Sequence, residues 1–261
     1  LHYPLRRQRQ MCIRDSDTTL EKNLSVYPFI KGAYLLDQEM GLFIKGELSG
    51  GLKQNNLNTA FRNNLWINQF KANTTNDKIR ILASVEATPI ENLTAKIKLN
   101  YLKVSNFNYF VNDSSDLSYY RNDYVNGFVN IVSPGVEVGY RFKGGHGFNL
   151  DFVYNKYQAE ETLFYTPTLE TNLDLFYKVK NNLKISSDIS YISGLVGSNS
   201  VENEVEDLSS IIDLNLKVDY DFNEKVGVFL YANNLLNKKY NYFKYYPVQG
   251  INVLGGLTVS F

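Results

Sequence analysis

The residues most often used for catalysis or metal binding are few in this sequence and lie far apart. The 261 residues include two histidines, His2 and His146, and one cysteine, Cys12. His146 lies in a glycine-rich turn, residues 144–147, where we expect a solvated side chain. A zinc site needs three or four ligands, and a nucleophilic triad needs a well-placed histidine. We therefore predict no catalytic residue, no metal site and no cofactor, and we expect the protein not to be an enzyme.

Carboxylates form two groups, and each has a simple interpretation. Asp213, Asp219 and Asp221 share odd positions with Lys217. Paired carboxylates can perform acid–base chemistry, but this regular spacing is typical of one water-facing side of a strand. The acidic run at residues 202–207 could chelate a cation, and we interpret it as a solvated loop.

Three polar segments combine aromatic rings with hydrogen-bonding groups. They are residues 63–66, 119–122 and 240–246. Such sets bind sugars or chelates by stacking and hydrogen bonding, and they also serve simply to pack a loop. The candidate ligand-contacting residues are Trp66, Tyr119, Tyr120, Arg121, Tyr242 and Tyr245.

The elements that must position these segments are indicated by alternation of apolar and polar residues. From Ile212 to Phe222 every even position is apolar and every odd position is polar. A period of two puts the apolar side chains on one face of a strand. The length is about twice that of a soluble strand and close to what a tilted strand needs to cross a membrane. One apolar and one charged face on so long a strand is typical of a transmembrane β-barrel.

The same alternation recurs along the chain and predicts eleven strands. Their residue ranges are 24–36, 41–52, 78–88, 93–105, 133–142, 147–157, 169–179, 183–194, 208–221, 225–234 and 250–261. Short turns alternate with long loops, as in outer-membrane barrels with periplasmic turns and external loops. Aromatic residues also cluster beside the short turns, as a belt at one membrane interface would require. We predict an all-β fold: an antiparallel up-and-down transmembrane barrel wall of eleven or twelve strands.

An odd number of strands raises the question of closure. Bacterial single-chain barrels have an even number of strands, and an open edge is not tolerated in lipid. Either a strand is hidden near residues 61–70 or 119–129, or the chain forms part of a larger barrel. A soluble β-sandwich would have shorter strands, so the strand lengths argue against that fold.

Composition and the first residues set further bounds. The formal net charge is zero and the mean hydropathy is −0.29, so nothing indicates nucleic acid as a partner. No apolar run approaches the roughly 18 residues of a membrane helix. Residues 1–16 are basic and lack alternation, and their MCIRDS segment resembles a translated sequencing-adapter read-through. We therefore expect a non-native leader at 1–16 and a barrel portion at 17–261.

The C-terminal end resembles TonB-dependent outer-membrane receptors. The resemblance is carried by residues 233–240 (NNLLNKKY), 247–250 (PVQG) and 255–261 (GGLTVSF). It implies the C-terminal half of a barrel of about 22 strands in the outer membrane of a Gram-negative cell. The implied function is uptake of a scarce ligand of the siderophore, vitamin or oligosaccharide class.

The same resemblance implies a set of partners. These are outer-membrane lipid, the barrel-assembly machinery, which would read the terminal aromatic Phe261, and TonB through a plug domain. Neither the plug nor the short TonB-contacting segment has a counterpart in this sequence. A plug-less porin, or a structural or adhesion barrel, would give the same pattern of strands and stays as the alternative.

Overall fold

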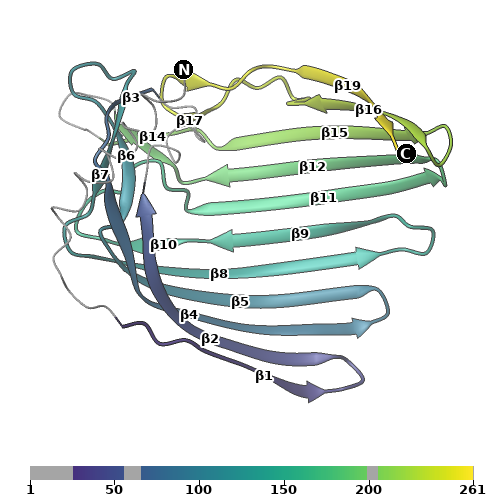
Figure 1. Ribbon diagram of the computed structural model, residues 1–261, viewed down its shortest axis with the longest axis horizontal. Helices are drawn as coiled ribbons and strands as arrows, with labels where there is room; N and C mark the ends of the chain where they lie inside the picture. The colour runs from purple at the N-terminus through teal and green to yellow at the C-terminus, as the bar shows by residue number, and fades with distance from the viewer. Residues whose placement is uncertain (1–25, 56–65, 199–204, 261) are drawn as a thin grey trace, which may run out of the picture.

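The computed structural model describes residues 26–55, 66–198 and 205–260. Eleven strands in chain order form one sheet, in which each strand pairs antiparallel with the next (Figure 1). These wall strands are β1 (Ile30–Asp37), β2 (Leu42–Asn55), β4 (Asn73–Ile90), β5 (Leu93–Ser105), β8 (Phe128–Arg141), β9 (Gly147–Tyr154), β11 (Leu169–Lys180), β12 (Leu183–Ser193), β15 (Ile211–Asp221), β16 (Val226–Asn233) and β19 (Asn252–Val259). A twelfth, short strand, β10 (Lys156–Gln158), also pairs with β8. The predicted all-β, up-and-down architecture is confirmed.

The register of the wall puts apolar residues of neighbouring strands into continuous rows on one face, which we call the outer face. One row consists of Tyr34, Ile44, Val85, Ile97, Val136 and Phe152. It continues through Thr171 and Tyr191 to Ile212. Several side chains of this row are unusually open for apolar groups: Ile97 is 65% exposed and Ile44 is 44% exposed. Exposed apolar surface spread over a whole sheet face is expected against lipid.

The opposite face, which we call the inner face, is polar. Its central row consists of Glu86, Lys96, Glu137, Asp151, Asn172, Ser190 and Asp213. Lipid cannot solvate such a row, so this face must meet water or a polar partner. The sheet is open in the described residues, because β1 and β19 at its edges pair on one side only. A closed barrel therefore needs further strands.

The long connections gather at one end of the wall (Figure 1). They carry three small sheets: β3 (Ile67–Gln69), β6 (Asn108–Asn112) and β7 (Tyr120–Tyr124); β13 (Val196–Ser198) and β14 (Val205–Asp207); β17 (Asn241–Phe243) and β18 (Tyr246–Pro247). The hypothesis of a hidden wall strand near 61–70 or 119–129 is wrong for the described residues, because β3 and β7 pair with each other outside the wall. Residues 61–65 lie outside the described residues. We call the described parts of the five long connections, which follow β2, β5, β10, β12 and β16, the cap.

The short turns lie at the other end, and aromatic rings gather beside them. Tyr140 and Phe142 meet edge to face with ring centroids 4.5 Å apart. His146, which we expected in solvent, instead lies against Phe142 at 5.4 Å and Tyr177 at 5.2 Å. It packs there because the neighbouring strand β11 brings Tyr177 beside the turn.

No helix long and apolar enough to cross a membrane occurs in the described residues.

Candidate functional site

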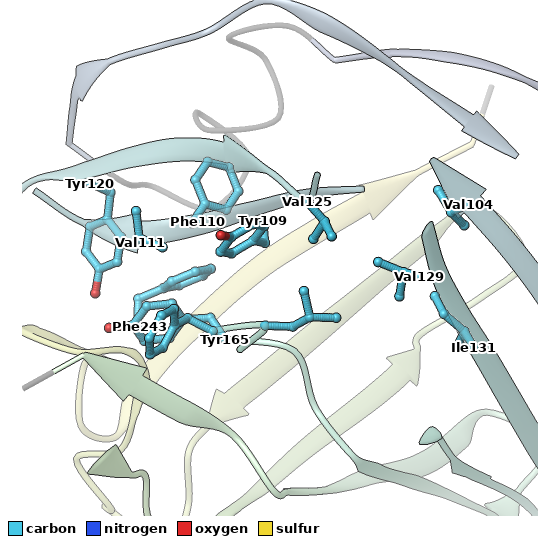
Figure 2. Packing of buried hydrophobic residues seen from close by; sticks show 12 residues of the cluster. Val104, Tyr109, Phe110, Val111, Tyr120, Val125, Val129, Ile131, Tyr165 and Phe243 are labelled. Atoms are coloured by element: carbon cyan, nitrogen blue, oxygen red, sulfur yellow. The ribbon is translucent and has the colours of Figure 1, made fainter. Parts of the chain in front are cut away.

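The cap has a hydrophobic core of its own (Figure 2). Its fully buried centre is Tyr120, with 0% of its surface exposed. The Tyr120 ring meets the rings of Tyr165 at 5.4 Å, Phe243 at 5.6 Å and Tyr246 at 5.5 Å, each edge to face. The buried cluster consists of Val104, Tyr109, Phe110, Val111, Tyr120, Val125, Val129, Ile131, Leu163, Phe164, Tyr165 and Phe243.

Three members of this cluster belong to the wall and show where the cap sits. Val104 of β5 and Val129 and Ile131 of β8 lie on the inner face near the strand ends. On β5 and β8 the inner face is therefore apolar where the cap packs on it, whereas the row nearer the short turns is charged. Because the cap folds onto the inner face, its loops stand over the entrance to the space that the wall partly surrounds.

Hydrogen bonds between distant segments tie the cap together. The Tyr120 hydroxyl donates to the carbonyl of Lys244 at 2.7 Å. The Tyr165 hydroxyl donates to the side-chain oxygen of Asn112, whose amide nitrogen donates to the carbonyl of Leu117 at 2.6 Å. Buried polar groups with partners of this kind fix one arrangement of the loops.

The structure brings two of the candidate ligand-contacting residues together on the cap surface. Trp66 is 66% exposed, and its ring lies 5.9 Å from that of Tyr119 at an interplanar angle of 53°. The Trp66 backbone is held from both sides: its N–H donates to the Tyr246 hydroxyl at 3.0 Å, and its carbonyl accepts from the N–H of Tyr120 at 2.8 Å. The exposed ring pair therefore stands on a fixed base.

The other candidates occupy different environments. Tyr120 is the buried centre of the cap core and has no surface open to a ligand. Arg121 is half-buried and pairs with Asp123 at 3.2 Å. Tyr242 is half-buried against Phe243, and burial raises its pKa. Tyr245 is 49% exposed, with the Lys244 ammonium 5.5 Å from its ring centroid.

Sequence reasoning missed the residues that hold this surface in place. Asp113 accepts hydrogen bonds from the Ser115 hydroxyl at 2.5 Å, from the Ser115 backbone N–H at 2.8 Å and from Asn68 at 3.0 Å. The first two bonds are the main reason why the pKa of Asp113 lies below its usual value. An Asp followed two residues later by Ser is a known turn signal. The turn at Asp113 could therefore have been predicted from the sequence. In the part of the chain that the structure describes, no group of three metal-binding side chains occurs.

Below the cap, the inner face carries a ladder of alternating charges. In order, its members are Lys45, Glu86, Lys96, Glu137, Lys98 and Asp151. Lys45 pairs closely with Glu86, and the Lys98 ammonium contacts Glu137 at 2.6 Å and Asp151 at 3.1 Å. The ladder borders a concave pocket of about 740 Å³, which Asn149, Asn172 and Asp174 also line. Single pairs of this exposure are weak, and their joint effect is a hydrophilic surface with both signs of charge.

Taken together, one apolar face, one charged face and a loop cap at one end define the wall of an outer-membrane β-barrel.

No family model matches the sequence, and no curated protein matches it. Among solved structures, the copper transporter OprC superposes with a TM-score of 0.67 at 14% identity, covering 90% of this chain and 39% of its own. A mutant of the ferric enterobactin receptor PfeA from Pseudomonas aeruginosa gives 0.65 at 12% identity, with 90% and 40% covered.

The pyoverdine outer membrane receptor FpvA from Pseudomonas aeruginosa PAO1 gives a TM-score of 0.63 at 10% identity, covering 90% of this chain and 36% of its own. The chain thus has the fold of part of the barrel of TonB-dependent receptors, as its C-terminal segments indicate. It spans about two fifths of the length of these structures. These three neighbours are a copper transporter, a ferric enterobactin receptor and a pyoverdine receptor.

Proposed function

We propose that this chain is the C-terminal barrel portion of an outer-membrane receptor that takes up a scarce small molecule with energy from TonB. The observation that carries the proposal is the pairing of a lipid-type face with a charged inner face in a sheet of this fold. A charged inner wall suits a polar plug domain as well as a passing hydrophilic ligand. The protein is not an enzyme in this proposal.

The ligand would belong to the siderophore, vitamin or oligosaccharide class and would first meet the cap. Support comes from the exposed rings of Trp66 and Tyr245, and from Tyr119, Arg121 and Tyr242 at half-buried positions. Rings that are open to solvent and fixed at the backbone can stack on a ligand at small entropic cost. Tyr120 would not contact the ligand. It would instead stabilise the cap and so fix the positions of the other five residues.

Further parts of the proposal concern partners and boundaries. The barrel-assembly machinery would read the terminal Phe261, which lies outside the described residues. The non-native leader at 1–16 lies outside them as well. The barrel portion, 17–261, would meet lipid through its outer face and TonB through a plug.

Two measurements on the full-length protein separate this proposal from a plug-less porin or a structural barrel. In a planar bilayer a plugged receptor shows no steady conductance, and a porin does. The periplasmic domain of TonB, titrated by calorimetry, should bind the full-length protein. Steady open channels together with no heat of TonB binding would contradict the proposal and favour the porin.

A further inference from the structure

The outer face has two charged side chains near its cap end. In the described wall strands, away from the turns and from the bulge at Lys78, the register puts no other charged residue on that face. The two are Lys103 of β5 and Lys156 of β10. A lone charge facing lipid is costly, so a pair at one end of an otherwise uncharged face calls for a physical reason.

The register places the two lysines near each other across β8. Lys103 is opposite Asn130, and Asn130 is opposite Gln158. Lys156 is opposite Val132, which neighbours Asn130 on the same face. With strands about 4.8 Å apart and same-face neighbours about 7 Å apart, the two lysine Cα atoms are roughly 12 Å apart. Both ammonium groups can therefore reach a single anion lying over Asn130.

Neither lysine is neutralised by a carboxylate in the described part of the chain. The Lys103 ammonium instead lies 4.4 Å from the ring centroid of Phe128, whose side chain is 48% exposed. A cation–π contact of this kind fixes the position of a charge without cancelling it. Inner-face lysines such as Lys98 differ, because they contact carboxylates directly. The outer pair therefore keeps its positive charge for an external partner.

The depth of the pair in the membrane follows from its neighbours along the strands. In β5 the outer face runs from Ile97 and Leu99 through Tyr101 to Lys103. In β9 and β10 it runs from Leu150 through Phe152 and Tyr154 to Lys156. The order aliphatic, aromatic, cationic is the order met on leaving the hydrocarbon core for the headgroup layer. The long-loop end of such barrels faces outside, so the pair lies at the level of the outer-leaflet headgroups.

We propose that Lys103 and Lys156 form a binding site for the phosphate group of an outer-leaflet lipid. Two ammonium groups would contact the phosphate oxygens, and Asn130 and Gln158 would add amide donors. The acyl chains of that lipid would lie along the apolar row below, over Val132 and Phe152. The proposal is independent of ligand uptake and of TonB.

The test uses full-length protein in an uncharged detergent and native mass spectrometry, with phosphatidic acid as the probe and diacylglycerol of the same chains as the uncharged reference. Wild type should bind phosphatidic acid at least about tenfold more tightly than diacylglycerol. The double variant K103Q/K156Q should lose that preference. The matched control K178Q/K184Q removes the same charge from two lysines that are opposite each other on the inner face, and it should keep the preference.

Each remaining outcome is decisive. If K103Q/K156Q binds phosphatidic acid as tightly as wild type, the site does not exist. If millimolar inorganic phosphate displaces the lipid from wild type, the pair is a free-phosphate site and the lipid assignment is wrong. Heat-modifiable migration on a denaturing gel reports whether each variant has folded. Should the double variant fail to fold, K103Q and K156Q singly should each weaken binding of phosphatidic acid, and unchanged binding in both would overturn the proposal.

Discussion

At the scale of single residues, neighbours in the sequence have opposite roles in the cap. Tyr119 is part of the ring pair with exposed Trp66, whereas Tyr120 is fully buried among rings from two other long connections. The backbone of β7 begins at Tyr120, so the two side chains point to different sides. The positions of the surface rings therefore depend on a residue that has no exposed surface of its own.

Replacement of Tyr120 tests that dependence. Tyr120→Ala should destabilise the closed cap by about 3–5 kcal/mol through the cavity it leaves. Tyr120→Phe should cost about 1 kcal/mol, since it removes only the hydrogen bond to Lys244. Hydrogen exchange of the amides of residues 108–124 and 241–247 measures both effects. The control Tyr119→Ala should cost less than Tyr120→Ala, and equal losses of protection would contradict the assigned roles.

Alkaline pH should open the cap through its buried tyrosines. Burial is the main cause of the raised pKa of Tyr109, Tyr120, Tyr165 and Tyr242. A raised pKa means that the folded cap prefers the neutral phenol. The stabilisation is therefore complete at pH values below about 10, which is the pKa of tyrosine in the unfolded state. It is lost as the pH rises above that value, because the opened state ionises first. Tyrosinate absorbance should rise together with proteolysis of the cap; ionisation near pH 10 with the cap still closed would show that these rings are exposed.

The sequence predicts which residue types occur in the candidate site, but it does not predict which of these residues are exposed and which are buried. Segment 119–122 is rich in rings and polar groups, but no period within it separates Tyr119 from Tyr120. The partners of Tyr120 come from Tyr165, Phe243 and Tyr246, each more than forty residues away. Loop packing of this range leaves no local pattern in the sequence.

At the scale of elements, the alternating pattern predicts all eleven wall strands but not where some of them end. β4 begins at Asn73 and β8 at Phe128, five residues before the ranges 78–88 and 133–142. These extensions lie at the cap end, where the outer face passes from the hydrocarbon core into the headgroup layer and the inner face packs under the cap. The two-residue alternation therefore stops there, while backbone pairing continues.

Two consecutive positions of β11 test which face meets lipid. Leu173 lies on the outer face opposite Leu150 and Ile189, and Asn172 lies on the inner face between Asp151 and Ser190. Leu173→Lys should destabilise the inserted barrel by about 2–4 kcal/mol. Asn172→Lys adds the same charge beside an aspartate and should be tolerated. The folded fraction in outer-membrane preparations, measured by heat-modifiable migration, should fall only for Leu173→Lys, and equal folding of both variants would reject the face assignment.

At the scale of the whole molecule, the open edges at β1 and β19 make this wall dependent on further strands. Residues 17–261 expressed alone should form no conducting monomer, since unpaired edge groups are costly in lipid. Planar-bilayer recordings of the purified fragment check this expectation. Stable single-channel currents from a monomer would show that the wall closes on itself.

The central claim is that an apolar face meets lipid and a polar face meets an inner space. Spin labels placed singly at residues 212–218, in full-length protein whose native cysteines are replaced by serine and which is reconstituted in a bilayer, test it most directly. Collision with dissolved oxygen should be high at Ile212, Leu214, Leu216 and Val218 and low at the three positions between them, because oxygen concentrates in lipid and the outer-face positions are open to it. Labels at these four positions that neither oxygen nor a water-soluble nickel complex can reach would place the row in a sealed protein interior and contradict the account.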